Sequence, residues 1–240
     1  NNSIFLISPR DFSPNADMVR SVITIGIPGA LITVLMSVAN IVLNNYIAIY
    51  GSDAVAAYGI AYKIDSVPVM LLVGLSQGVT PLIGYCYGAG QLRRMNDTMR
   101  LSMLYGAIVG AVFTIIFLLT GWQLASIFLH QDDLIALTAN ILKVLCLSAP
   151  TLGIINMVTS YFQALGKAVH SLAITILRNA VLFIPTVVLL DHVWGLQGVI
   201  SAQPVVEALL TVICIAMYGH ELRAGQKRAS HTLDRAQPES

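Results

Sequence analysis

The chain has 240 residues and a formal net charge of +1, and its composition is 56% hydrophobic but only 10% charged. Soluble domains carry roughly 25% charged residues, so this chain lacks the polar surface that keeps a protein in water. The near-neutral charge also excludes a nucleic-acid-binding protein, which needs a basic footprint. The mean hydropathy of +0.77 therefore predicts an integral membrane protein.

Residues 1–20 are mixed in character and precede the first long apolar run. Pro9 and Pro14 would each interrupt a helix, so we predict an extended cytoplasmic connector over 1–20. The chain opens Asn1-Asn2-Ser3 without an initiator methionine, which is the pattern of a fragment or of a trimmed chain.

Long apolar segments follow, and each is hydrophobic on nearly all faces rather than along one stripe. About 20 apolar residues suffice for a helix to cross a hydrocarbon layer of ~30 Å, whereas a membrane β-barrel needs alternating strands, which this sequence lacks. The connections are short, so neighbouring helices should run antiparallel. We predict an all-α bundle of six transmembrane helices over 21–219, with a polar cytoplasmic tail over 220–240. The approximate spans are 22–49, 54–88, 101–120, 134–166, 170–190 and 196–219.

The distribution of lysine and arginine predicts the orientation, because cytoplasmic connections are enriched in both. Alternate segment ends are basic, and the ends between them carry aspartate. This pattern places both termini of a multi-pass protein on the cytoplasmic side of the inner membrane, with Trp122 and Trp194 at the outer interface. The basic residues are Arg10, Arg20, Arg93, Arg94, Arg100, Lys167, Arg223, Lys227 and Arg228, and the acidic ones are Asp53, Asp132, Asp133 and Asp191.

The segment from 54 to 90 organises the chain because it carries charges deep in an apolar run. Lys63 lies nine residues after Ala54. That separation is about 13.5 Å along a helix, close to half the thickness of the hydrocarbon layer. Charged groups at that depth usually face a partner or a wet cavity and mark a transport route. Lys63 and Asp65 project about 200° apart on a helix, so we expect each to find a partner on another helix.

Other charged residues lie inside later segments. Glu207 is near the middle of the last one and is a candidate partner for Lys63 or Arg178. We expect Lys143 and Arg178 to form ion pairs that fix helix packing. A desolvated carboxylate can take up and release a proton, so we assign Asp65 and Glu207 to function.

Prolines, glycines and cysteines inside the apolar segments add structural expectations. The prolines should kink their helices, as in transporters with broken helices, and glycines four residues apart should let helix backbones pack closely. The cysteines show no CxxC spacing and are predicted to be buried small hydrophobes, with no metal site. The residues concerned are Pro28, Pro68, Pro81, Pro150, Pro185 and Pro204, the pairs Gly74/Gly78, Gly84/Gly88 and Gly106/Gly110, and Cys86, Cys146 and Cys214.

Residues 74–78, Gly-Leu-Ser-Gln-Gly, match the G-x-S-x-G pattern of serine hydrolases. That motif works on a strand-to-helix turn beside a base, whereas here it lies inside a predicted spanning helix. An intramembrane serine hydrolase using Ser76 is therefore only an alternative, and we predict no catalytic residues and no enzyme.

Several short motifs together resemble the multidrug and toxin extrusion (MATE) transporter family. The second segment carries Gly-Ile-Ala, Gly-Leu-Ser-Gln-Gly, Pro-Leu-Ile-Gly-Tyr and Gly-Ala-Gly, which look like the second helix of a MATE lobe. Asp-Phe-Ser-Pro looks like the link between lobes, Gly-Ile-Pro-Gly like the start of the first helix, and Phe-Gln-Ala-Leu-Gly like the end of the fourth. The motifs occupy 59–61, 74–78, 81–85, 88–90, 11–14, 26–29 and 162–166.

The resemblance implies cation-coupled export, in which two six-helix lobes rock about a central cleft. This chain would be the C-terminal lobe, with a missing N-terminal lobe as its partner and small amphiphilic or cationic drugs as substrates. No cofactor is implied beyond a coupling ion, H+ or Na+. A lipid-linked oligosaccharide flippase of related architecture is the alternative; it would need a more cationic cleft. The predicted substrate and ion pathway consists of Asn40, Asn44, Lys63, Asp65, Gln77, Asn156 and Glu207.

The chain departs from one branch of that family. The NorM-like branch carries acids on the first and fourth helices of this lobe, and the corresponding positions, near Met36 and between Ile154 and Asn156, hold none. The chain is therefore more similar to the DinF-like branch, whose coupling acid is on the other lobe. Asp65 is an additional candidate within this lobe.

Overall fold

The computed structural model describes residues 16–236, and every element in that range is helical. The first half contains α1 (Ala16–Ala48), α2 (Ser52–Gly88), α3 (Leu92–Phe128), α4 (Asp132–Leu145), the 3-10 turn η2 (Cys146–Ser148) and α5 (Ala149–Ala164). The second half contains α6 (Ala168–Ile176), the π-helical turn η3 (Leu177–Leu182), α7 (Phe183–Trp194) and α8 (Leu196–Ala236). The predicted all-α fold class is thereby confirmed.

Among the described residues, five helical stretches are long and apolar enough to cross a membrane. The segments α4–η2–α5 and α6–η3–α7 each form one such stretch. Helix α1 has 33 residues and ends in the apolar stretch Thr33–Ala48. The chain is therefore a multi-pass membrane protein. The five stretches are Ser52–Gly88, Leu92–Phe128, Asp132–Ala164, Val169–Trp194 and Leu196–Leu222.

Several helices extend beyond the apolar segments that predicted them. The third was expected over 101–120, whereas α3 has 37 residues. At 1.5 Å per residue that is about 55 Å, well beyond a hydrocarbon layer of ~30 Å. Similarly, α8 continues to Ala236 through the predicted polar tail. Hydropathy identifies the residues that lie in the hydrocarbon layer. The helix continues past them through polar residues, because no proline interrupts it there. Residues 1–15 of the predicted connector lie outside the described range, and α1 already begins at Ala16.

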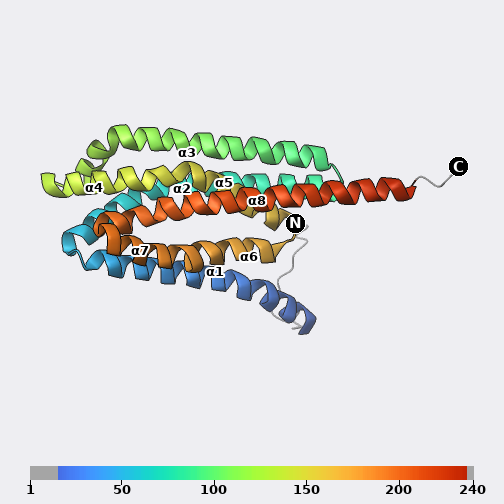
Figure 1. Ribbon diagram of the computed structural model, residues 1–240, viewed down its shortest axis with the longest axis horizontal. Coiled ribbons are helices and arrows are strands. Elements are labelled where there is room, and N and C mark those ends of the chain that lie inside the picture. The colour runs from blue at the N-terminus through green and yellow to red at the C-terminus, as the bar shows by residue number, and fades with distance from the viewer. Residues whose placement is uncertain (1–15, 237–240) are drawn as a thin grey trace, which may run out of the picture.

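Successive spans run antiparallel (Figure 1). The connections 49–51 and 129–131 and Gly195 lie at one end of the bundle, and the connections 89–91 and 165–167 lie at the other. Arg93 and Lys167 therefore share one end, whereas Asp53 and Asp132 share the opposite end. The two ends of the bundle differ in charge, as the sequence pattern predicted.

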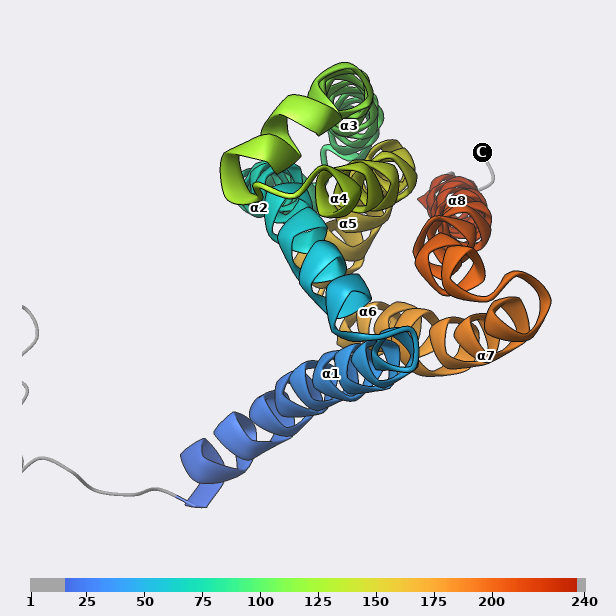
Figure 2. The same ribbon diagram turned by 90° about the vertical axis from the view of Figure 1, so that its left-hand side faces the viewer.

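Viewed along the helices, the bundle has an open outline (Figure 2). Helices α3, α4 and α5 gather on one side, and α1 lies with α6 and α7 on the other. Helix α2 runs between these groups, and α8 packs against both α5 and α7. One buried apolar cluster surrounds Ile47, Ile141 and Ile200, and a second surrounds Ile83 and Met157. The three cysteines are buried and free, which confirms their interpretation as small hydrophobes.

A hydrogen bond ties the connection before α2 to the last turn of α7. Tyr50, in the connection before α2, donates to Asp191 at 2.6 Å (Oη to Oδ1). This hydrogen bond raises the pKa of the Tyr50 hydroxyl above its ordinary value, because the bond holds the proton on the oxygen.

The break before Pro150 receives a compensating donor. Proline has no N–H, so the carbonyl of Cys146, four residues earlier, loses its α-helical partner. The hydroxyl of Thr114 on α3 donates to that carbonyl at 2.6 Å. A freed carbonyl within a membrane helix is thus satisfied by a neighbouring helix, which ties α3 to the break between α4 and α5.

Two glycines of α3 bring that helix against the backbone of α5. A Cβ added at Gly110 would lie 2.4 Å from the carbonyl oxygen of Ala149, and one at Gly106 would lie 3.2 Å from the carbonyl oxygen of Gly153. Conversely, a Cβ at Gly153 would lie 2.4 Å from the carbonyl oxygen of Gly106. The packing role predicted for Gly106 and Gly110 is confirmed.

The other two glycine pairs do not pack in this way within the described residues. A Cβ at Gly74, Gly78 or Gly88 would meet nothing within 4 Å, and one at Gly84 would make an ordinary contact of 3.6 Å with the Ala164 carbonyl oxygen. The expectation of close packing was therefore wrong for Gly74/Gly78 within the described residues, and of the pair Gly84/Gly88 only Gly84 contacts another helix, α5.

We expect Gly110→Val to lower the free energy of unfolding by about 3 kcal/mol, because the added side chain must displace the α5 backbone. Gly78→Val is the matched control, since it adds the same β-branched residue to a helix where a Cβ meets nothing within 4 Å. Thermal unfolding midpoints in detergent measure the difference. Equal midpoints for the two variants would refute the role assigned to Gly110.

Candidate functional site

A cavity of about 90 Å³ lies between α1, α2, η3, α7 and α8. This volume is far below the roughly 300–1,000 Å³ of a pocket for a drug-sized ligand, so the cavity suits water or a small ion better than a drug. Arg178 and Glu207 line it together with a set of uncharged polar side chains. These are Asn40, Tyr58, Tyr62, Asn179 and Gln203.

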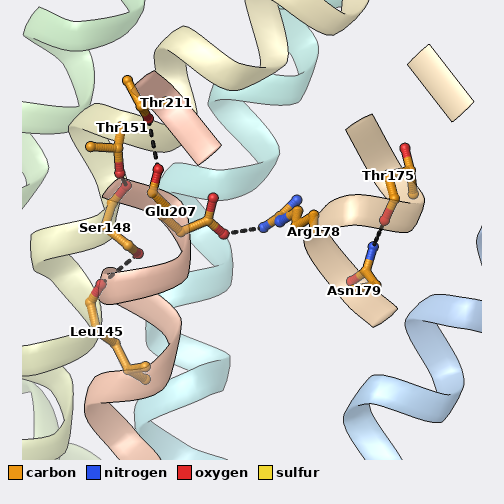
Figure 3. Close-up of polar contacts among 8 residues, drawn as sticks. All are labelled: Leu145, Ser148, Thr151, Thr175, Arg178, Asn179, Glu207 and Thr211. Carbon is orange, nitrogen blue, oxygen red and sulfur yellow. Dashed lines mark hydrogen bonds and ion pairs between the residues drawn. The ribbon is translucent and has the colours of Figure 1, made fainter. Parts of the chain in front are cut away.

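Arg178 reaches the cavity from the π-helical turn η3. Pro185 has no N–H to donate to the carbonyl of Val181, which lies inside η3, so regular α-helical bonding fails at this point. The helix widens there, and π turns of this kind are frequent at functional sites. Asn179, the next residue, donates from its amide to the carbonyl of Thr175 at 3.0 Å, which fixes the turn (Figure 3).

Glu207 of α8 forms an ion pair with Arg178 at the cavity. The guanidinium Nη2 forms an ion pair with Glu207 Oε1, and Figure 3 shows the arginine pointing from η3 toward α8. Glu207 is 1% exposed, and its second oxygen, Oε2, is buried without a hydrogen-bond partner. The backbone of α8 is held there by Thr211, whose hydroxyl donates to the Glu207 carbonyl at 2.8 Å. The pair therefore leaves one carboxylate oxygen available.

Asp65, on α2, is a second buried carboxylate. It is 2% exposed, and its Oδ1 has no hydrogen-bond partner in the described part of the chain. Among the described residues, no cation lies within ion-pair distance of Asp65. An ionised carboxylate without a counter-ion is costly in such a place, so Asp65 is suited to carry a proton.

Tyr58 lines the cavity and lies on the same helix as Asp65. It lies two helical turns before Asp65 on α2, lines the cavity, and is 5% exposed with no partner for its hydroxyl. Its ring stacks on Tyr62 with the centroids 5.9 Å apart. Sequence reasoning missed both tyrosines as site residues. Their signal was the placement of polar-tipped aromatics one turn apart on the helix that carries Asp65.

The cavity gathers only part of the predicted pathway. Asn40 lines it and donates from its amide to the carbonyl of Met36 at 3.0 Å. Asn44, one turn further along α1, is exposed, lies outside the lining and donates to the Asn40 carbonyl at 2.9 Å. Gln77 is exposed on α2, and Asn156 is half-buried on α5; neither lines the cavity.

The predicted charge pairing is realised at one position. Glu207 pairs with Arg178 and not with Lys63. Lys63 and Lys143 are exposed, and within residues 33–167 and 169–222 neither forms an ion pair. The expectations that Lys63 and Asp65 would each find a partner, and that Lys143 would form a packing pair, were therefore wrong for the described residues. The two lysines are exposed, whereas Asp65 is buried with no described cation within ion-pair distance.

The sequence of this chain is similar to those of known proteins. The model of the MatE family matches residues 28–189. Multidrug export protein MepA of Staphylococcus haemolyticus (strain JCSC1435) is 30% identical over 214 residues, which are 89% of this chain and 47% of that protein. Multidrug export protein MepA of Staphylococcus aureus (strain NCTC 8325 / PS 47) is 31% identical over 214 residues, covering 87% of this chain and 46% of that protein. The chain thus spans about half the length of the curated relatives it matches.

Solved structures match the fold over almost the whole chain. One is described as the inward-facing conformation of a multidrug resistance MATE family transporter of the MOP superfamily. It superposes with a TM-score of 0.84 at 21% identity, covering 92% of this chain and 52% of the other. The structure described as the outward-facing conformation gives a TM-score of 0.82 at 20% identity, over 94% and 51%.

Proposed function

The chain belongs to the MatE family of membrane transporters, and from this premise we propose that it forms one lobe of a multidrug efflux antiporter. The curated relatives are multidrug export proteins, and the chain covers 46–47% of the length of two of them. A second lobe would therefore complete the transporter, with this chain as the C-terminal half. The substrates would be small amphiphilic or cationic drugs, held in the cleft between the lobes.

The coupling ion would act at the buried carboxylates. The observation that supports this most directly is the pair of unpartnered oxygens, Asp65 Oδ1 on α2 and Glu207 Oε2 on α8. Charged groups inside membrane segments are costly and usually serve ion or substrate pathways. Exchange of H+ or Na+ at these groups would alter the charge of the bundle interior between the two halves of the transport cycle. Asn40, Asn44, Gln77 and Asn156 would add polar contacts along the route.

The basic end of the bundle would face the cytoplasm. It carries Arg93, Arg94, Arg100 and Lys167, and cytoplasmic connections are enriched in such residues. Both chain termini would then be cytoplasmic, and the protein would reside in the inner membrane.

Drug export accounts for the interior better than the two alternatives do. An oligosaccharide flippase would need free cations in its cleft, whereas Lys63 and Lys143 are exposed outside the cavity and Arg178 is neutralised by Glu207. A hydrolase would need a reactive serine, whereas Ser76 lies within α2 and donates its hydroxyl to the Val73 carbonyl at 2.8 Å.

Reconstitution of the full-length transporter into liposomes tests the proposal. We expect an imposed H+ or Na+ gradient to drive accumulation of a fluorescent amphiphilic cation against its own gradient, and an ionophore that collapses the ion gradient to abolish it. Comparison of the two imposed gradients identifies the ion. Movement of a pyrophosphate-linked lipid oligosaccharide, with no gradient-driven transport of the cation, would favour the flippase instead.

A further inference from the structure

A larger cavity, of about 440 Å³, lies at the basic end of the bundle between α2, α3, α5 and α8. It is separate from the cavity that contains Arg178 and Glu207, and the proposed transport function does not use it. Its lining combines basic, amide and aromatic side chains, including Tyr87, Arg93, Asn96, Arg100 and Tyr161.

Two arginines of α3 supply the positive charge of this cavity. Arg93 and Arg100 are seven residues apart, so they lie on one face of the helix about 10.5 Å apart along its axis. Neither forms an ion pair within residues 33–167 and 169–222. Asp97 lies between them on the same face and is not within ion-pair distance of either.

The second acid at the cavity, Glu221 of α8, is already neutralised. Its Oε1 pairs with Nζ of Lys167, which begins the segment after α5. This contact joins α8 to the α5–α6 connection, and it leaves Arg93 and Arg100 against Asp97 among the described lining residues. The unpaired charge in the cavity is therefore positive, and it suits an anion.

An uncharged polar group in the wall also lacks a partner. The side-chain oxygen of Asn96 is buried and forms no hydrogen bond with any described residue. Tyr161 forms a rigid floor, because it is 2% exposed and packs edge-on against Tyr218 with ring centroids 5.1 Å apart. A buried polar group without a partner is unfavourable, and a ligand hydroxyl would satisfy it.

The position of the cavity along the membrane normal indicates which kind of anion it binds. Arg100 directly precedes the apolar run 101–120, so it lies where hydrocarbon gives way to headgroups. Below it, α3 exposes Leu101, Leu104 and Tyr105, at 52%, 56% and 54%, and these offer an apolar surface for acyl chains. Basic pockets between membrane helices on the cytoplasmic side are typical binding sites for anionic lipid headgroups.

We propose that this cavity binds the headgroup of an anionic phospholipid. Arg93 and Arg100 hold its phosphodiester through charge-assisted hydrogen bonds, and Asn96 bonds a headgroup hydroxyl. The acyl chains lie along the exposed apolar face of α3. A lipid bound there bridges α2, α3, α5 and α8 and joins the helices at this end.

Native mass spectrometry of the full-length protein in detergent tests the proposal by titration with phosphatidylglycerol, phosphatidylcholine or inorganic phosphate. We expect phosphatidylglycerol to bind about tenfold more tightly than phosphatidylcholine. Both lipids have the phosphodiester, but phosphatidylcholine adds a trimethylammonium cation that the two arginines repel and lacks the headgroup hydroxyl for Asn96. Arg100→Gln should weaken phosphatidylglycerol binding about tenfold, whereas Arg100→Lys should weaken it about threefold because the charge remains. Arg93→Gln provides a second variant should Arg100→Gln fail to fold.

Arg94→Gln is the matched control. It removes the same charge from the same helix, but Arg94 lies outside this cavity and its guanidinium donates to Gln91 at 3.5 Å. Its phosphatidylglycerol affinity should stay within about twofold of the wild type. An equal loss in Arg94→Gln, or equal binding of the two lipids, would overturn the proposal in favour of general surface charge. Saturation by inorganic phosphate alone at comparable affinity would overturn the lipid as the ligand. None of these measurements depends on drug transport.

Discussion

Replacing Asp65 with asparagine is expected to reduce gradient-driven drug export by at least about tenfold, because the amide keeps the shape of the side chain but cannot carry a proton. Asp65 is 2% exposed and has an oxygen without a partner, so little else in the described bundle depends on its charge. The measurement is the initial rate of drug accumulation in liposomes under an imposed pH gradient. Binding of the drug at equilibrium should change less than the rate of gradient-driven export.

Asp53→Asn is the matched control for that experiment. Asp53 is exposed in the first turn of the same helix, so its substitution makes the same chemical change at the end of α2. Its export rate should stay within about twofold of the wild type, since an exposed charge contributes little. Normal pH-driven export by Asp65→Asn, from protein that is folded and present in equal amount, would rule out Asp65 as the coupling group.

Replacing Arg178 with methionine is expected to lower the free energy of unfolding by about 3–5 kcal/mol, because it leaves the buried Glu207 charge without its partner. The double variant Arg178→Met/Glu207→Leu should regain most of that loss, because apolar residues of similar size can replace a buried pair. Thermal and denaturant unfolding in detergent measure both effects. Together with Glu207→Leu alone, the series forms a double-mutant cycle that isolates the pair.

Lys143→Met serves as the control for charge removal. Lys143 is exposed and makes no ion pair with the described residues, so its substitution should change the free energy of unfolding by less than about 0.5 kcal/mol. If Arg178→Met were as stable as Lys143→Met, or if the double variant were no more stable than Arg178→Met, the pair would have no structural role.

The membrane class and the antiparallel order of the helices could be predicted because both follow from composition along the chain. A long apolar run must be helical in lipid, because its backbone has to form hydrogen bonds within the segment. Basic residues at alternate segment ends indicate the cytoplasmic connections, so successive helices run in opposite directions. Helix ends could not be predicted, since α3 begins with the largely polar residues 92–100 and α8 continues past 219. Hydropathy predicts which part of a helix lies in the hydrocarbon layer. It does not predict where the helix ends, because polar residues can continue the helix among water or lipid headgroups.

The site was harder to predict because it depends on which helices become neighbours. Asp65 and Glu207 could be singled out from sequence, because buried acids are rare in apolar segments. The partner of Glu207 could not, since Lys63 and Arg178 were equally eligible until η3 was found to aim Arg178 at α8. Likewise, the glycine pairs have the same spacing, and only the position of α5 distinguishes Gly110 from Gly78.

The π turn η3 also has a consequence for how one span serves several neighbours. Such a turn holds one residue more than α geometry, so the helices on its two sides are out of phase by about 100°. Accordingly α6 packs on α5, whereas α7 packs on α8, although both belong to a single crossing of the membrane. The extra residue rotates the apolar face of α7 relative to that of α6. A single membrane crossing can therefore pack against α5 along its first half and against α8 along its second half.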